Sequence, residues 1–444
     1  MATIRKIKNS KKGSYQIIVS NGYDAEGKQI RVTTTFTPDA DKTPRQKEKQ
    51  IQEFALEFEN KVKTGQLYSG DKITFAEFVK EWETKEAKLQ LEETTLYNYR
   101  RHLERVILPA IGKYKMTKIT PLLLEEFYQS LLKDDARADG KGGYKISSIT
   151  KFHKIISGIM RTAVRWKVIE RNPCESAELP RNREKNNEIK HFTYEQAIRF
   201  LEAMDKPYKV TFKAREGKMP SGKTVHINEF TKNRMLPLQF KIFYRLALFG
   251  GFRKGELIAL TWNDIDFEKR VISVTKSVGH VETGQKVKGT KTSGSNGLIP
   301  IPKQEIELLT KWKAEQKNFM LCVGSKWEGF RGAEFDKNNV FIQTNVHIGK
   351  TMNMSTPYRK FVDFIKTYNE TVENEDDKLP VIPLHGLRHT CATLNIAMGT
   401  DIKTVQAILR HRNIQTTLNI YTHALEEKKR EATSNLELLL NAKA

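Results

Sequence analysis

The pattern of hydrophobic and polar positions predicts a small β-rich segment at the start of the chain. Residues 14–20 and 29–36 are rich in β-branched and aromatic residues, which is typical of strands. Asn21-Gly22 supplies turn residues between them. Over residues 43–63 the apolar positions instead recur at spacings of three and four, which predicts a helix. We therefore expect a short sheet with one helix in this part of the chain.

The rest of the chain is expected to be mainly helical. Thr74 is a candidate helix cap, and residues 73–170 show helical periodicity throughout. The pattern beyond residue 190 predicts helices at 193–204, 238–249, 254–260, 304–316, 357–368, 386–398, 401–410 and 424–440, and strands at 270–275 and 297–301. The Lys- and Gly-rich segment 207–236 is expected to be irregular.

Length and linker composition divide this pattern into three domains. At about 150 residues per domain, 444 residues suggest three. The linkers at 65–70 and 180–190 place them at 1–66, 72–180 and 185–444. The fold class expected is multidomain and mainly α with small β elements. No apolar run is long enough to cross a membrane, and three separate cysteines without a CxxC motif favour a reducing, cytoplasmic location.

The charge balance points to a polyanionic partner. The chain has 76 Lys and Arg against 53 Asp and Glu, a net charge of +23 with a pI near 9.6. Such a balance is typical of proteins that bind nucleic acid, although a basic protein without that role is the alternative. Residues 147–168 support nucleic-acid binding further, because basic residues without any acid lie opposite an apolar stripe. A face of one sign is typical of phosphate contacts, and a merely solvated face is the alternative.

Two motifs are considered and disfavoured. GKMPSGKT at 217–224 fits the phosphate-binding P-loop pattern, but the strand-like Val225-His226-Ile227 follows it where a P-loop requires a helix. His385 and His389 have the spacing of two metal ligands on one helix. Arg388 lies between them and would repel a divalent cation. We therefore expect neither a nucleotide cofactor nor a metal.

A third set of residues carries a coherent chemistry. Arg253 follows a Gly-Gly turn, and His385 and Arg388 are three residues apart, so that both project from one helical face. Arginines neutralise charge that develops on phosphate oxygens, and histidine moves protons. His411, Tyr421 and a lysine from the turn between the expected strands 270–275 and 297–301 complete the set. Such a set is suited to phosphoryl transfer in which the tyrosine is the nucleophile. Taken singly, Tyr421 could be an ordinary aromatic residue and Arg253 an ion-pair partner of Glu256.

These residues resemble the tyrosine recombinases, the phage integrase family, and most of all the three-domain integrases of phages and conjugative transposons. The resemblance lies in GGFRKGELIALTW at 250–262, LHGLRHT at 384–390, LRHR at 409–412 and LNIYTH at 418–423. It implies a catalytic set of Arg253, Lys291, His385, Arg388, His411 and Tyr421. Lys286 and Lys288 remain alternatives for the lysine. Arg410 stands where the family typically has glycine, so the backbone there is expected to lack the freedom of glycine.

The resemblance also implies roles for the three domains: arm-site binding by 1–66, core-site binding by a helical SAM-like domain at 72–180, and catalysis by 185–444. The residues expected to contact DNA are Thr95, Tyr99, Arg100, Lys151, Lys154, Arg161 and Arg165 in the second domain and Lys6, Lys8 and Arg31 in the first. The nearest alternatives are a type IB topoisomerase and a catalytically silent DNA-binding protein on the same scaffold.

The implied reaction cuts and rejoins DNA through a 3′-phosphotyrosyl intermediate, without ATP or metal. The implied partners are double-stranded attachment sites of core and arm type, three further copies of the chain in a tetrameric synapse, and accessory DNA-bending or excision factors. The implied setting is the cytoplasm of a bacterial host, with no membrane partner.

Overall fold

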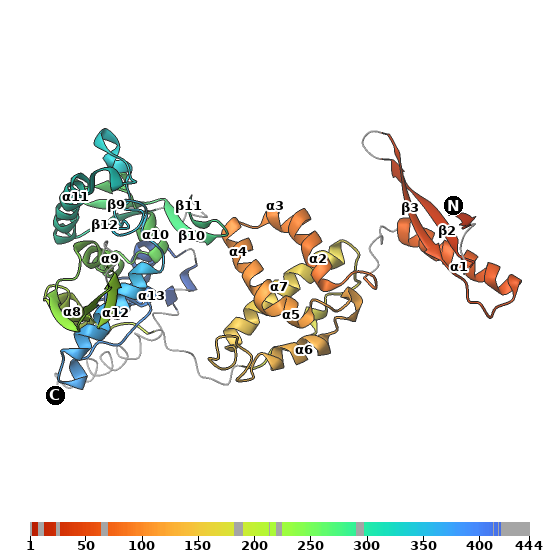
Figure 1. Cartoon of the computed structure of the whole chain (residues 1–444), viewed down its shortest axis with the longest axis horizontal. Coiled ribbons are helices and arrows are strands. Elements are labelled where there is room, and N and C mark those ends of the chain that lie inside the picture. The colour runs from red at the N-terminus through yellow and green to blue at the C-terminus, as the bar shows by residue number, and fades with distance from the viewer. Residues whose placement is uncertain are drawn as a thin grey trace, which may run out of the picture. The chain divides into compact units, whose positions relative to one another are not determined.

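The structure is a computed structural model that describes residues 2–418, apart from 8–12, 24–26, 64–69, 182–189, 213, 219–223, 290–296, 412 and 416 (Figure 1). It divides into two compact units, residues 1–185 and 186–444. Helices dominate both units and the sheets are small, which confirms the predicted fold class. Among the described residues, no helix is both long and apolar enough to span a membrane.

The first unit begins with a three-stranded antiparallel sheet that one helix covers. The strands β1 (Thr3–Lys6), β2 (Tyr15–Tyr23) and β3 (Gln29–Phe36) lie in sequence order. Helix α1 (Pro44–Lys63) packs on β2, where Ile17 and Val19 are buried. Phe36 stacks on Phe54 with ring centroids 4.4 Å apart. Both predicted strands and the predicted helix are confirmed, and β1 adds an edge strand that the hydrophobic pattern did not indicate.

The remainder of the first unit is helical. Its helices are α2 (Phe75–Trp82), α3 (Lys88–Gln90), α4 (Glu93–His102), α5 (Leu108–Ile111), α6 (Pro121–Ser130) and α7 (Ile146–Arg165). Thr74 caps α2 as predicted, in a capping box with Glu77. The apolar stripe of α7, which includes Phe152, Ile156 and Ile159, is fully buried and forms the centre of this core.

The second unit combines helices with several short sheets. Its helices are α8 (Tyr194–Ala203), α9 (Leu238–Phe249), α10 (Lys254–Ala259), α11 (Lys303–Val323), α12 (Thr356–Glu370), α13 (Leu384–Ala397) and α14 (Ile402–Leu409). β8 (Ile265–Asp266), β9 (Val271–Val274) and β12 (Gly297–Pro300) form a sheet in the order β12-β9-β8, and β10 (Lys276–Val281) pairs with β11 (Gly284–Gly289). The expected helix at 424–440 lies outside the described residues.

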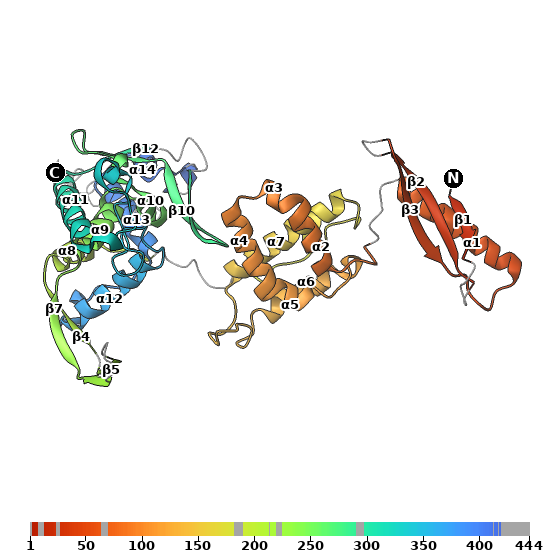
Figure 2. The same cartoon turned by 45° about the horizontal axis from the view of Figure 1, so that its top comes forward.

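The described residues of the segment 207–236 form four strands, so the expectation of an irregular segment was wrong. Strand β4 (Tyr208–Phe212) pairs with β7 (Phe230–Arg234), and β5 (Arg215–Lys218) pairs with β6 (Thr224–Ile227) between them (Figure 2). All five residues of β7 are exposed, so this strand needs no apolar face and shows no alternating pattern. Its partner in the sheet lies about twenty residues away, beyond the reach of a local pattern.

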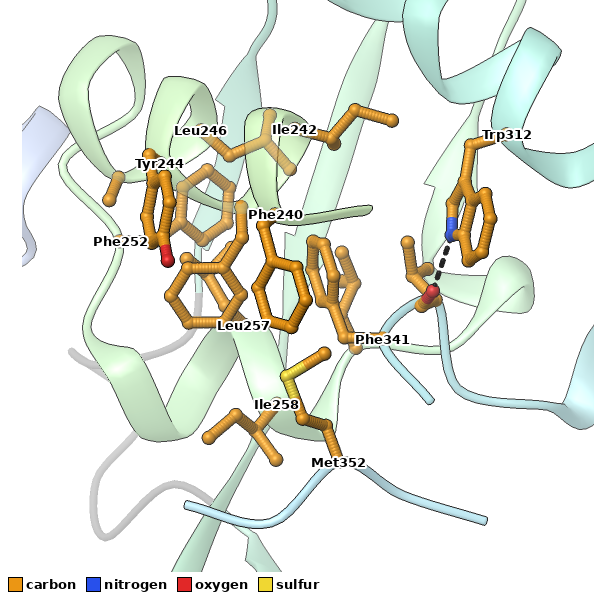
Figure 3. Packing of buried hydrophobic residues seen from close by; sticks show 14 of the residues in the cluster. Phe240, Ile242, Tyr244, Leu246, Phe252, Leu257, Ile258, Trp312, Phe341 and Met352 are labelled. Atoms are coloured by element: carbon orange, nitrogen blue, oxygen red, sulfur yellow. Dashed lines mark hydrogen bonds between the residues drawn. The ribbon is translucent and has the colours of Figure 1, made fainter. Parts of the chain in front are cut away.

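The core of the second unit surrounds α9 (Figure 3). This helix is apolar on nearly every side, as expected of a helix with neighbours all around, and α10, α11, α12 and α13 all pack against it. Two polar side chains in the core have backbone partners: Trp312 donates to the carbonyl of Val340 at 2.7 Å, and the hydroxyl of Tyr244 donates to the carbonyl of Pro357 at 2.9 Å. Helix α9 ends in the Gly250-Gly251 turn, which leads directly to Arg253.

Candidate active site

Three segments that are far apart in the chain meet at the candidate site: the turn after α9, the first turns of α13 and the residues that follow α14. Gly251 is required at this meeting point because its φ is +57°, in the left-handed region. A Cβ atom there would lie 2.7 Å from Leu409 Cδ2 and 3.5 Å from Cys391 Sγ. The Gly-Gly turn thus permits α13 and α14 to approach the start of α10.

Arg253 caps α10 and is held by Glu256. Its Nη1 donates to Glu256 Oε1 at 2.7 Å, its backbone nitrogen donates to Oε2 at 2.9 Å, and its Nη2 donates to the carbonyl of Arg410 at 3.2 Å. The Arg253 side chain is 37% exposed while that of Glu256 is only 4% exposed. The guanidinium is therefore anchored from inside the protein and open on its outer side. The Arg253–Glu256 ion pair is thus present, and it leaves Arg253 accessible.

Arg388 is a buried cation whose described partners are main-chain carbonyls. The residue is 1% exposed, and it donates to the carbonyls of Gly251 and Leu409. No hydrogen-bond partner for its Nε is found among the described residues. Burial, and then the charges of Arg253 and Arg410, lower the pKa of Arg388 to about 9. A cation in such surroundings is stabilised when an anion binds beside it.

Two histidines of the site, His385 and His411, have lowered pKa values. His385 is exposed at the start of α13, and partial burial followed by the charges of Arg388 and Arg253 lowers its pKa. His411 is half-buried, and burial followed by the same two arginines lowers its pKa to about 3. Its Nδ1 lies 3.0 Å from the hydroxyl of Thr417, which leaves Nε2 for another partner. His385 is thus the more solvent-accessible of the two histidines, and His411 is held neutral by a pKa of about 3.

His389, the second histidine of the disfavoured metal motif, lies beside His385. The two rings meet edge to face with centroids 4.7 Å apart. Within the described part of the chain, no group of three or more His, Cys, Asp and Glu side chains is arranged to hold a metal ion.

Arg410 belongs to this cluster, and the sequence analysis did not include it among the site residues. Its backbone takes the left-handed conformation, with φ 52° and ψ 47°, despite the absence of the typical glycine. Its Nη2 donates to Glu256 Oε2 at 2.7 Å. The available signal was an arginine at a glycine position next to His411, together with an acid three residues after Arg253. Neither the left-handed backbone nor the Arg410–Glu256 pair could be inferred from that signal alone.

Two of the predicted catalytic residues, Lys291 and Tyr421, lie outside the described residues. The alternative lysines are on β11, where Lys286 is opposite Gly279 and Lys288 opposite Ser277 of β10. This hairpin packs against α10, where a Cβ on Gly255 would lie 2.6 Å from Ser277 Oγ. The lysine-bearing hairpin therefore lies against the helix that Arg253 caps.

The predicted DNA-contacting residues of the first unit occupy several surfaces. The basic residues of α7 are exposed opposite its buried stripe: Lys151, Lys154, Arg161 and Arg165. An acid from another segment, Glu86, pairs with Arg165. On α4, Arg100 pairs with Glu83, Tyr99 stacks on Trp82, and Thr95 is half-buried. Lys6 on β1 and Arg31 on β3 are exposed, and Lys8 lies outside the described residues.

The site has a net positive charge suited to a phosphodiester. Arg253, Arg388 and Arg410 carry three positive charges and Glu256 one negative charge, which leaves two positive charges in a largely buried cluster. A phosphodiester has one negative charge, and a second develops as a nucleophile adds to phosphorus. Fixed cations that face this developing charge stabilise the transition state.

The chain matches the profile of the phage integrase family over residues 219–428 and that of the phage integrase N-terminal SAM-like domain over residues 74–132. It is 26% identical to a "Tyrosine recombinase XerC-like" protein of Caldanaerobacter subterraneus subsp. tengcongensis, over 97% of each chain. It is 24% identical to the ICEBs1 integrase of Bacillus subtilis, over 99% of this chain and 100% of the relative. The transposase of Tn916 from Enterococcus faecalis is 29% identical over 39% of this chain and 40% of its own length.

Solved structures show the same fold. A Tn1549 transposon integrase in complex with a circular intermediate DNA has a TM-score of 0.59 and 19% identity, over 82% of this chain and all of that one. A lambda integrase dimer bound to a COC′ core site has a TM-score of 0.50 and 17% identity, over 94% of each chain.

Proposed function

This chain belongs to the phage integrase family and is a site-specific tyrosine recombinase, and on that premise we propose how its residues divide the work of cutting and rejoining DNA. Tyr421 is the nucleophile. Its phenolic oxygen attacks the scissile phosphorus, the bond from phosphorus to the 5′ oxygen breaks, and a 3′-phosphotyrosyl link remains. Attack by a 5′-hydroxyl from a partner strand reverses the step and releases the tyrosine.

Arg253 and Arg388 bind the non-bridging oxygens of the scissile phosphate. The observation that carries this proposal is the buried Arg388, whose hydrogen bonds go to neutral carbonyls and whose charge no carboxylate contacts within the described chain. A guanidinium held in this way keeps its charge for a ligand. The outer side of Arg253 is open to solvent, which supports its role as the second contact to the phosphate.

The histidines take different parts in proton transfer. The lower the pKa of an imidazole, the weaker it is as a base, and the pKa of His411 is held at about 3. We therefore assign proton acceptance from Tyr421 to His385, whose basicity rises when the phosphate adds its negative charge. His411 donates a hydrogen bond from Nε2 to a phosphate oxygen while Thr417 orients its ring. Lys291 returns a proton to the leaving 5′ oxygen.

The parts of the chain have separate contacts with DNA in this proposal. Residues 72–180 bind the core site, residues 1–66 bind arm sites, and residues 185–444 perform catalysis. Four copies act together in a synapse, with accessory DNA-bending or excision factors, inside a bacterial host. The exposed basic residues Lys151, Lys154 and Arg161 on α7 support the core-site role.

The nucleophile is tested with an attachment-site duplex that is nicked beside the scissile phosphate, so that loss of a short fragment traps the covalent intermediate. We expect the unaltered chain to form an adduct in EDTA without ATP, and Tyr421→Phe to bind the duplex without forming one. Tyr358→Phe is the matched control, because Tyr358 is exposed on α12 and has no role in the proposal. An adduct from Tyr421→Phe, or a strict requirement for magnesium or ATP, would contradict the mechanism.

A further inference from the structure

Arg410 has a backbone conformation that favours glycine. It ends α14 with φ 52° and ψ 47°, where the Cβ of an L-residue crowds the carbonyl oxygen. Glycine avoids this strain, and glycine is the residue that the resemblance predicts at this position. An arginine in this conformation needs a compensating interaction of its side chain.

The Arg410 side chain is enclosed within the site. It is 3% exposed and donates to Glu256 Oε2 at 2.7 Å and to the carbonyl of Ile408 at 3.0 Å. Its guanidinium carbon lies 5.3 Å from the ring centroid of Phe252, in cation–π contact. A Cβ on Gly297 of β12 would lie 3.0 Å from Arg410 Cδ, so this glycine also makes room for the side chain.

The backbone of the same segment makes a separate contribution. The carbonyl of Leu409 accepts a hydrogen bond from Arg388, and the carbonyl of Arg410 accepts one from Arg253 at 3.2 Å. These two contacts depend on the left-handed conformation and not on the side chain at position 410. A glycine would preserve them and remove only the guanidinium.

We propose that Arg410 is a positioning residue for DNA cleavage: by sharing the Glu256 carboxylate with Arg253, it keeps the positive charge of Arg253 available to the scissile phosphate. Glu256 divides its two oxygens between the two arginines, with Oε1 on Arg253 Nη1 and Oε2 on Arg410 Nη2. Without Arg410, the carboxylate would be neutralised by Arg253 alone. This inference rests on the proposed role of Arg253 in binding the phosphate.

The ionisation of Glu256 agrees with this sharing. Burial by itself raises the pKa of a carboxylic acid, but the charge of Arg410, followed by the hydrogen bonds and charge of Arg253, outweighs burial and lowers the pKa of Glu256. Glu256 is thus a fixed negative charge, and the number of arginines around it sets the net charge of the site.

The net charge of the site can be changed and then restored by substitution. Three arginines and one glutamate leave two positive charges in the unaltered site, and Arg410→Gly leaves one. In the double variant Arg410→Gly, Glu256→Gln, Arg253 and Arg388 remain without the glutamate. The net charge of the site is therefore again two positive charges. We expect Arg410→Gly to slow single-turnover cleavage of the nicked duplex at least tenfold while its Kd for DNA changes less than threefold. The double variant should recover part of the lost rate.

Arg270→Gly is the matched control. Arg270 also has a left-handed backbone, with φ 56°, but its side chain is exposed in the turn before β9 and contacts none of the site residues described above. Its replacement relieves the same backbone strain, so we expect an unchanged cleavage rate. A merely structural Arg410 predicts that the two losses in the double variant add together. Cleavage by Arg410→Gly at the unaltered rate, or additive losses, would overturn the proposal.

Arg410→Lys provides a second variant with the charge retained. Lysine lacks the planar fork that reaches Glu256 and Ile408 together, so its cleavage rate should fall between those of arginine and glycine. A lysine variant slower than the glycine variant would contradict the role of charge. Failure of the unaltered chain to form any adduct would instead refute the proposed function, so the two failures are distinguishable.

Discussion

The guanidinium of Arg388 donates a hydrogen bond to the backbone carbonyl of Gly251, although 137 residues separate them in the chain. Through this bond the turn after α9 holds a buried arginine of α13. The contact depends on the left-handed conformation of Gly251, which brings the turn against Leu409 and Cys391. The geometry of the candidate site is therefore sensitive to a residue that has no side chain.

We expect Gly251→Ala to destabilise the chain and to slow DNA cleavage. The left-handed backbone costs about 1–2 kcal/mol for an L-residue, and the new methyl group would also crowd Leu409 Cδ2 at 2.7 Å. Gly332→Ala is the control, because Gly332 has the same φ of +57° with open space around its Cβ position. Thermal unfolding should show a larger loss for Gly251→Ala, and equal losses would contradict the crowding argument.

Stability should decrease as the pH falls below about 6.5. Burial is the main cause that lowers the pKa of His389 to about 4, whereas an unfolded histidine has a pKa near 6.5. Between these values the unfolded chain binds a proton that the folded chain excludes, so acid favours unfolding. His389→Gln removes this difference, and its melting temperature should depend less on pH from 6.5 to 4. A melting temperature of His389→Gln that depends on pH as strongly as that of the unaltered chain would contradict this prediction.

The salt dependence of DNA binding should distinguish Arg161 from Arg165. Each phosphate contact contributes about one to the slope of log K against log salt. Arg161→Ala should lower the slope by about that amount for every DNA sequence tested. Arg165→Ala should lower the slope less, because Glu86 neutralises Arg165. Glu86→Gln should steepen the slope by freeing that arginine. Lys133→Ala, at an exposed position after α6, is the control. An unchanged slope for Arg161→Ala would show that the basic face of α7 is solvated and does not contact phosphates.

Removal of residues 1–66 should leave cleavage of a minimal core site intact and impair reactions on DNA that also carries arm sites. The reason is that β1, β2, β3 and α1 pack among themselves, with Ile17, Val19, Ile51 and Ala55 in their own small core. Gel-shift and cleavage assays on the two DNA types provide the measurement. A truncated chain that cannot cleave the core site would show that this segment belongs to the catalytic machinery.

Local sequence patterns were sufficient wherever neighbouring residues determine the structure. The capping box at Thr74, the buried stripe of α7 and the strands β2 and β3 all follow from residues a few positions apart. Hairpin β10–β11 was not predicted, because its polar and glycine-containing strands lack a clear alternating pattern. The polar strands β5 and β7 lack that pattern too, whereas β6 contains the strand-like Val225-His226-Ile227 noted from the sequence.

The residue types and the three-residue spacing of His385 and Arg388 predict phosphoryl transfer without any structure. The charge and orientation of these groups depend on how the chain folds. The hydrogen bond from Arg388 to Gly251 and the one from Arg410 to Glu256 join residues that are 137 and 154 positions apart in the chain. The physical reason is that desolvation and electrostatic interaction act through space, and a linear pattern contains no distances between α10, α13 and the end of α14.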